Sequence, residues 1–142
     1  MDSYDFVIVG AGSAGCVLAN RLTESGRHRV LLLEAGGSDR NFWVRMPIGY
    51  GKTFHHPELN WRYTSEPVPG LGDRETYWPR GKVLGGSSAI NAMVFIRGQR
   101  EDYDSWEALG NPGWGWRGVG EVFRRMEDNL AGADEHRGAA AR

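Results

Sequence analysis

The chain has 142 residues and a formal charge of -1, with 17 Lys and Arg against 18 Asp and Glu. Because this balance lacks the basic excess that binds nucleic acid, we expect no nucleic-acid partner. The one cysteine, Cys16, cannot form an internal disulfide, and this usage suits a reducing compartment. Its place in a glycine-rich motif predicts a small buried side chain.

The N-terminus is acidic and polar and lacks the cationic patch and long apolar run of a signal peptide. The longest purely aliphatic run, residues 30–33, is far too short to cross a bilayer. We therefore expect a cytoplasmic protein without a membrane span, and peripheral membrane association stays open. The sequence does not determine the oligomeric state.

Residues 5–34 predict one β-α-β unit. The apolar run at 6–9 ends at a glycine, as expected of a strand buried on both faces of a parallel sheet. Apolar residues then follow helical spacing over 14–23, and Gly26 is a suitable terminator. A second buried strand at 30–33 completes the unit, whose crossover should be right-handed.

The turn between the first strand and the helix carries the pattern Gly10-x-Gly12-x-x-Gly15. The first glycine allows a tight turn, the second lets a pyrophosphate approach the backbone, and the third lets the helix pack close to the strand. Ser13 and Ala14 open the helix, whose first N–H groups and partial positive charge favour a pyrophosphate. The pattern predicts a dinucleotide-binding α/β fold.

Glu34 ends the second strand and is followed by Ala35. A carboxylate there can accept hydrogen bonds from both ribose hydroxyls and would repel a 2′-phosphate, which disfavours NADP against NAD or FAD. This first motif does not separate FAD from NAD. The alternative interpretation of this motif is a glycine-rich turn that binds no ligand.

From residue 38 to residue 77 the chain is rich in Pro, Gly, Asn and isolated aromatic residues and shows no convincing helix. We predict a long ordered excursion, because its aromatic side chains offer too much surface to leave in water. The adjacent histidines His55 and His56 lie beside Pro57 without a completing ligand set, so we predict no metal site.

A second motif begins at Arg80 and ends at Asn91. Its Gly-Lys pair does not make a mononucleotide P-loop, because Val83 stands where that motif needs Ser or Thr. The run Gly85-Gly86-Ser87-Ser88 can instead turn the backbone sharply and direct N–H groups at an electron-rich ligand. These residues alone leave the ligand unidentified.

Residues 78–94 resemble the signature of the glucose-methanol-choline oxidoreductases, especially the choline dehydrogenase and alcohol dehydrogenase-like branch. Shorter matches at 33–36, 59–61, 96–98 and 102–106 follow the family's order, and the resemblance covers roughly residues 4–129. It implies an α/β, Rossmann-like FAD-binding domain, here incomplete and occupying residues 1–130.

The two motifs together give a set of predicted FAD contacts, of which those in the second motif rest on the resemblance. They are Gly10, Gly12, Ser13, Ala14, Gly15, Glu34, Ala35, Arg80, Val83, Gly85, Gly86, Asn91, Ala92, Met93 and Val94. Some family members attach FAD through a histidine that here corresponds to Ile90. The resemblance therefore implies non-covalent FAD.

The resemblance implies oxidation of a primary or secondary alcohol, with a histidine base near the family's C-terminal end and hydride transfer to flavin N5. None of the chain's 4 histidines follows that motif, so we nominate no catalytic residue and expect the substrate domain to be absent. The alternative is a non-catalytic module that binds FAD or NAD and is inactive on its own. The sequence identifies neither the alcohol nor the acceptor that reoxidises the flavin.

Helical spacing returns at 103–109 and again at 119–126, with a turn-forming connector at 111–116. We expect the tryptophans of this connector to anchor packing rather than to bind a ligand. Residues 131–142 offer no apolar face, and we expect this tail to fray.

Overall fold

The computed structural model describes residues 2–139 and divides the chain into two compact units, residues 1–94 and residues 95–142. Each unit is described by itself. The elements in chain order are β1 (Phe6–Val9), α1 (Ser13–Thr23), β2 (Val30–Leu33), α2 (Phe42–Arg45), η1 (Pro47–Gly49), α3 (Tyr50–Thr53), β3 (Tyr63–Thr64), η2 (Pro69–Leu71), β4 (Tyr77–Trp78), η3 (Gly86–Ala89), α4 (Arg100–Ala108) and α5 (Trp116–Met126).

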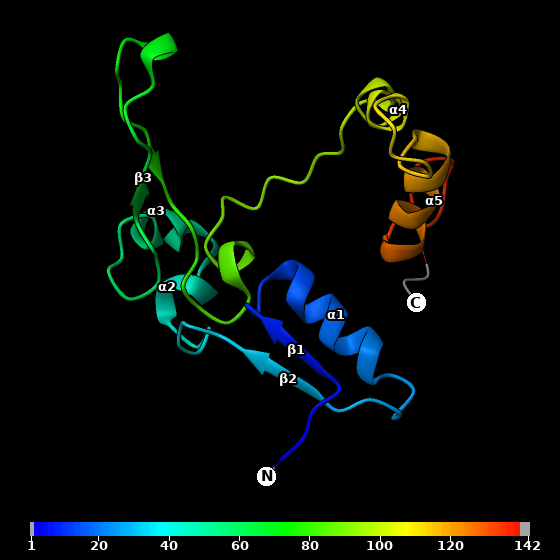
Figure 1. Cartoon of the computed structure of the whole chain (residues 1–142), viewed down its shortest axis with the longest axis horizontal. Helices are drawn as coiled ribbons and strands as arrows, with labels where there is room; N and C mark the ends of the chain where they lie inside the picture. The colour runs from blue at the N-terminus through cyan, green and yellow to red at the C-terminus, as the bar shows by residue number, and fades with distance from the viewer. Residues whose placement is uncertain (1, 140–142) are drawn as a thin grey trace. The chain divides into compact units, whose positions relative to one another are not determined.

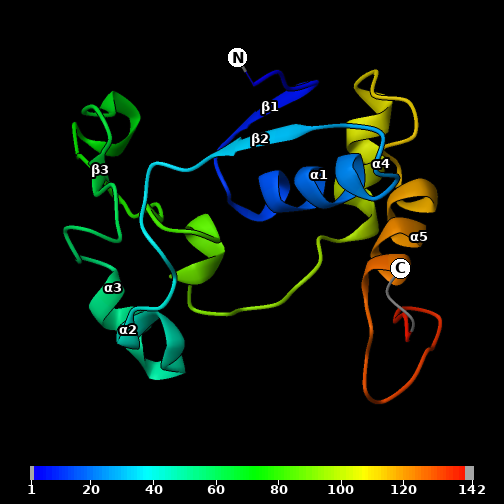
Figure 2. The same cartoon turned by 90° about the horizontal axis from the view of Figure 1, so that it is seen from below.

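The first unit opens with the predicted β-α-β arrangement. β1 and β2 pair in parallel, with Phe6 opposite Val30 and Val9 opposite Leu33, and α1 packs along one face of the pair (Figures 1 and 2). Gly26 follows the helix with a φ of +67°, a conformation that glycine adopts without strain. The predicted α/β class and its parallel start are confirmed.

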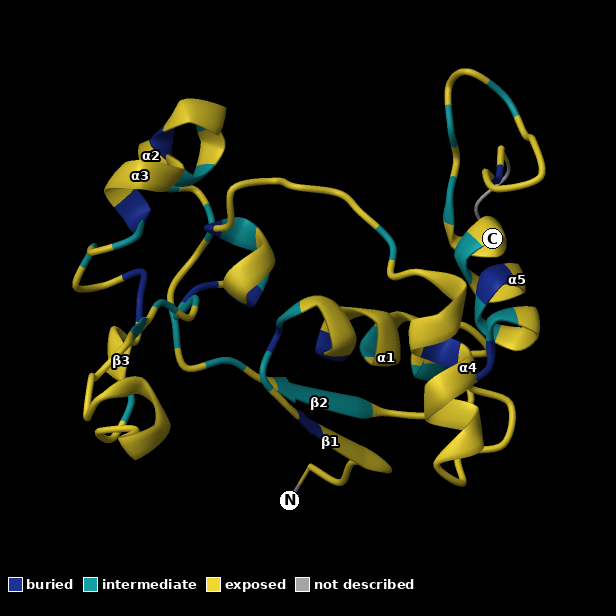
Figure 3. Cartoon of the chain, turned by 90° about the horizontal axis from the view of Figure 1, so that it is seen from above, coloured by how far each residue is buried: buried dark blue, intermediate teal, exposed yellow. Residues whose placement is uncertain are grey.

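The two strands are not buried on both faces, which corrects the sequence-based expectation. Ile8 lies next to Gly15 of α1 and is 8% exposed, whereas its neighbour Val9 is 84% exposed. Most of β1 has the colour of exposed residues in Figure 3. Among the described residues of the first unit, α1 is the only helix that packs on this two-stranded sheet. Three of the four residues of the apolar strand β1 are therefore exposed to solvent.

Between the β-α-β unit and the second motif, the chain forms several elements that are too short to leave a periodic pattern. The helix α2 begins where the side chain of Asn41 accepts a hydrogen bond from Trp43 N at 2.9 Å, a side-chain cap. The strands β3 and β4 pair antiparallel, with Tyr63 opposite Trp78. The expectation of no helix was wrong here. The helices α2 and α3 have four residues each, which is too short for an apolar repeat to show in the sequence.

The main apolar cluster of the first unit lies beneath the second motif. Leu59, Val83 and Ile90 are buried together, and Val44 and Ala89 pack against them. Two of these buried residues belong to the second motif itself. The motif is therefore anchored by its own apolar side chains. Its glycines take no part in this cluster, and Gly86 contacts the backbone of Gly12 instead.

In the second unit, α4 and α5 pack through aromatic rings around the buried Tyr103. Trp106, Trp116 and Phe123 each lie within 6 Å of it between ring centroids. Trp116 contributes to packing as predicted, while Trp114 is exposed and contacts Trp106. An ion pair of 2.6 Å joins Arg97 to Glu127.

The tail at 131–142, for which we predicted fraying, folds back on the residues that follow α5 where the structure describes it. Asn129 N donates to Gly138 O at 2.8 Å, and Asp128 forms an antiparallel bridge with Ala139. Backbone groups make these contacts, which is why the lack of an apolar face gave no sign of them. The last three residues of the predicted tail lie outside the described range.

Three further expectations can be compared with residues 2–139. No helix in this range combines the length and apolar character needed to cross a membrane. No group of three or more His, Cys, Asp or Glu side chains in it is placed to hold a metal ion. Cys16 is exposed rather than buried, which corrects the expectation, and its thiol donates to Ala11 O at 3.3 Å.

Candidate functional site

The glycine-rich turn has the geometry that its three glycines predict. Gly10 has a φ of +96°, and its N–H donates to Leu33 O at 2.7 Å, which closes the turn against β2. Gly12 is the N-cap of α1 and has no side chain to cover the first amides of the helix. Gly15 is buried, and a Cβ there would strike the carbonyl of Gly10.

The carboxylate of Glu34 ties the end of β2 to this turn. Its Oε2 accepts a hydrogen bond from Ala11 N at 2.7 Å, and its Oε1 accepts one from Gly36 N at 2.8 Å. Because each carboxylate oxygen has two acceptor sites, both oxygens can accept a further hydrogen bond. Glu34 therefore supports the turn and can still accept hydrogen bonds from a ligand.

The second motif docks directly on the first, backbone against backbone. Gly85 N donates to Ala11 O at 2.8 Å, and Leu84 N donates to Gly37 O at 2.9 Å. A Cβ added at Gly86 would lie 2.9 Å from the Cα of Gly12, and the φ of Gly86 is +60°. Two motifs far apart in sequence thus form one continuous surface.

Hydrogen bonds from two serines hold the turn of the second motif. The Ser87 hydroxyl accepts from Gly81 N at 3.1 Å, and the Ser88 hydroxyl donates to Gly85 O at 2.6 Å. The short helix η3 then leads to Ile90, which is 4% exposed within the apolar cluster. In the second motif, serine hydrogen bonds hold the loop, and the buried side chain of Ile90 anchors its C-terminal end.

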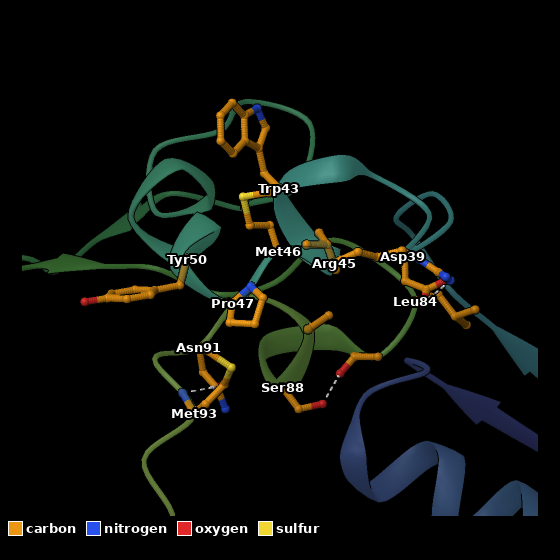
Figure 4. Close-up of a pocket in the computed structure, with 13 residues that line it drawn as sticks. Asp39, Trp43, Arg45, Met46, Pro47, Tyr50, Leu84, Ser88, Asn91 and Met93 are labelled. Carbon is orange, nitrogen blue, oxygen red and sulfur yellow. Dashed lines mark hydrogen bonds and ion pairs between the residues drawn. The ribbon is translucent and has the colours of Figure 1, made fainter.

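A cavity of about 310 Å³ opens beside this loop, between it and the segment from α2 to α3 (Figure 4). Arg45 pairs with Asp39 at 3.3 Å, so the charges at its rim largely cancel. The cavity is lined by Asp39, Trp43, Val44, Arg45, Met46, Pro47, Tyr50, Leu84, Gly85, Ser88, Ala89, Asn91 and Met93. An aromatic and apolar lining of this kind suits a planar ring system.

The structure brings most of the predicted contacts into one place. Gly10, Gly12, Gly15, Glu34, Val83, Gly85 and Gly86 form the docked turns, and Asn91 and Met93 line the cavity. Ser13 and Ala14 are exposed on the first turn of α1, and Ala35 is exposed beside Glu34.

The remaining predicted contacts lie at the edges of this site. Arg80 is exposed, with its guanidinium 5.3 Å from the centroid of the Trp78 ring. Ala92 and Val94 are exposed on chain without regular structure, next to Met93, which has a φ of +57°. Within residues 2–139, no hydrogen bond joins Ala92 or Val94 to the docked turns.

Sequence reasoning missed the outer wall of the cavity, which the segment 39–50 supplies. The one available signal was the density of aromatic residues and Pro47 in a stretch without periodicity. Single-turn helices cannot show an amphipathic repeat, so this wall had no recognisable pattern.

Comparison with known proteins identifies the family. The family model described as GMC oxidoreductase matches residues 4–141. The alcohol dehydrogenase [acceptor] of Pseudomonas putida is 52% identical over 126 residues, which are 89% of this chain and 23% of that protein. The oxygen-dependent choline dehydrogenase of Vibrio vulnificus (strain YJ016) is 50% identical over 135 residues, 95% of this chain and 24% of that protein.

A solved structure shows the same fold. The crystal structure of pyridoxine 4-oxidase from Mesorbium loti matches with a TM-score of 0.89 and 36% identity, over 98% of this chain and 27% of that one. The chain spans about a quarter of the length of the relatives that it matches. Its β1-α1-β2 start coincides with the N-terminal FAD-binding part of these enzymes, and the chain belongs to the GMC oxidoreductase family.

Proposed function

We propose that residues 1–94 bind FAD without a covalent bond. The observation that carries this proposal is the docking of Gly85 and Gly86 on Ala11 and Gly12. It places a turn suited to a pyrophosphate and a cavity suited to a planar ring next to each other in one compact unit. An extended dinucleotide needs both features, whereas a glycine turn without a ligand needs neither.

The residues present fit the three parts of FAD. The amides at the start of α1, behind Gly12, offer donors and positive potential to the pyrophosphate. Glu34 has acceptor capacity for the ribose hydroxyls. The cavity beside Asn91 and Met93 would take the isoalloxazine, and exposed backbone at 91–94 can hydrogen-bond its edge.

Non-covalent attachment is supported by the residue at position 90. Ile90 has no nucleophilic atom, and its side chain is buried with Leu59 and Val83 rather than directed at the cavity. A covalent link of the kind that some family members form would need a histidine at this position, and Ile90 offers none.

We further propose that the complete enzyme oxidises the CH–OH group of a choline-like or other primary or secondary alcohol in the cytoplasm. Bound FAD would accept the hydride from the alcohol carbon at N5. The chain's own contribution is to bind and orient the cofactor, since we assign no catalytic base to any of its residues. The names of the relatives support this substrate class.

The proposal is tested by titrating purified chain 1–142 with FAD, followed by quenching of its tryptophan fluorescence and by the visible spectrum. Parallel titrations use NAD and NADP. We expect FAD to bind and NADP to bind most weakly. Binding of NAD with no binding of FAD would favour the non-catalytic dinucleotide module, and no binding of either would overturn the proposal.

A second measurement concerns activity. With saturating FAD and excess choline under anaerobic conditions, we expect no bleaching of the flavin absorbance by chain 1–142, because we assign it no base. Flavin reduction that depends on both choline and the protein would contradict this expectation.

A further inference from the structure

Asn60 is the most completely bonded buried polar side chain of the first unit. It is 2% exposed, and it sits where Leu59 and Trp61 pair with the start of the second motif. Its Oδ1 accepts hydrogen bonds from Arg62 N at 2.9 Å and from Arg80 N at 3.0 Å. Its Nδ2 donates to Phe54 O at 2.8 Å and faces Thr53 O at 3.4 Å.

These partners fix the orientation of the amide. A neutral Asn side chain has two acceptor sites on its oxygen and two N–H donors on its nitrogen, and all four are used here. Backbone N–H groups surround the oxygen and carbonyls surround the nitrogen, so neither a carboxylate nor an aliphatic side chain can satisfy both sets. The site selects an amide.

Thr53 extends this network to the other end of the second motif. It is fully buried, and its hydroxyl can donate to Tyr50 O at 2.9 Å or to Ile90 O at 3.4 Å. Its own carbonyl faces Asn60 Nδ2. Two adjoining buried side chains therefore contact Arg80, where the motif begins, and Ile90, where its apolar anchor lies.

We propose that Asn60 and Thr53 are positioning residues that hold both ends of segment 80–90 against the C-terminal end of α3. The segment between these ends contains Gly85 and Gly86, which dock on the glycine-rich turn. Neither side chain faces the cavity, so both act through the backbone of Arg80 and Ile90. The inference rests on the proposed FAD site, because it concerns the accuracy of that site.

The first test replaces single polar atoms. Asn60→Asp keeps the acceptor but sets a second oxygen against the carbonyls of Phe54 and Thr53, so we expect FAD affinity to fall at least about tenfold. Thr53→Val removes the hydroxyl at nearly constant volume and should weaken FAD binding about fivefold, whereas Thr53→Ser keeps the hydroxyl and should restore most of it. Asn111→Asp, an exposed amide of the second unit, is the matched control.

Two readouts separate positioning from general destabilisation. The vibronic structure of the bound flavin spectrum reports the ring's surroundings, and it should change in Asn60→Asp and Thr53→Val even at FAD concentrations that saturate them. Backbone hydrogen exchange of chain 1–142 without FAD should become faster at 80–90 in these two variants and stay unchanged in β1 and β2.

The outcomes distinguish the inference from the proposed function. If wild type binds FAD and both variants match it in affinity, spectrum and exchange at 80–90, the inference is overturned and the proposed function stands. If wild type binds no FAD, the proposed function fails, and exchange at 80–90 alone decides whether these residues hold the segment. Uniformly faster exchange throughout residues 1–94 would also overturn the inference, since it indicates a general structural role.

Discussion

Gly86 and Gly12 approach so closely that a Cβ on the first would stand 2.9 Å from the Cα of the second. Real side chains do not tolerate such a distance to backbone, and the φ of +60° at Gly86 adds strain for any other residue. The contact explains why the second motif carries its glycine pair at this point. A substitution at Gly86 can therefore test whether the contact between the two motifs matters for binding.

Replacement of Gly86 by alanine should separate the two motifs. We expect Gly86→Ala to weaken FAD binding at least about tenfold, because a loop shift near 1 Å disrupts contacts to both halves of the cofactor. Gly70→Ala is the matched control, since a Cβ there meets nothing within 4 Å and its φ is not positive. Equal FAD affinities of the two variants would show that the docking of the loops does not matter for binding.

The sequence predicted the first half of this site well because its signals are local. A strand, a glycine turn, a helix and an acidic strand end each have a periodicity or a spacing, and all four lie where the pattern indicated. The wall at 39–50 and the roles of Asn60 and Thr53 had no such signal, since they arise from contacts between distant segments. The sequence also contained no indication that Arg62 and Met93 have positive φ values, because neither residue type favours that conformation.

Glu34 should determine whether the site prefers a nucleotide with a free ribose 2′-hydroxyl or one with a 2′-phosphate. Replacing the carboxylate by an amide in Glu34→Gln removes one acceptor and the negative charge, so binding of ADP should weaken about tenfold or more. The same change removes repulsion, so the affinity for ADP relative to its 2′-phosphorylated form should fall. Titration calorimetry with both nucleotides measures this ratio.

The control for Glu34 is Glu75→Gln, an identical change at an exposed position between η2 and β4. It should leave both nucleotide affinities unchanged. A constant affinity ratio in Glu34→Gln would mean that the carboxylate only braces the turn through Ala11 and Gly36.

Neighbouring residues of β1 should differ sharply in their contribution to stability. Ile8 packs beneath α1 close to Gly15, so Ile8→Ala should lower the free energy of unfolding of the first unit by about 2 kcal/mol. Val9 is exposed, and Val9→Ala should change it by less than about 0.5 kcal/mol. Hydrogen exchange of the β2 amides in chain 1–142 measures both values, and similar losses would show that the second face of the sheet is covered in solution.

The second unit should lose stability in acid through Glu127. Hydrogen bonds from Asn129 and from Gly138 N, together with the charge of Arg97, hold the pKa of this carboxyl below its ordinary value of 4.5. A group whose pKa is lowered by folding stabilises the fold at pH values above its unfolded pKa. This contribution is lost as the pH falls from about 4.5 through the lower pKa of the folded state.

Glu127→Gln should therefore remove part of the acid sensitivity of α4 and α5. We expect the variant to be less stable than wild type at pH 7, because the bonds to Arg97 weaken, and the difference to shrink below pH 4.5. Amide hydrogen exchange in the two helices, measured from pH 7 to pH 3 and corrected for intrinsic rates, follows this change. Glu121→Gln on the exposed side of α5 carries the same change of charge and should track wild type at every pH. A constant difference between Glu127→Gln and wild type across this range would mean that Glu127 stabilises the unit by shape rather than by charge.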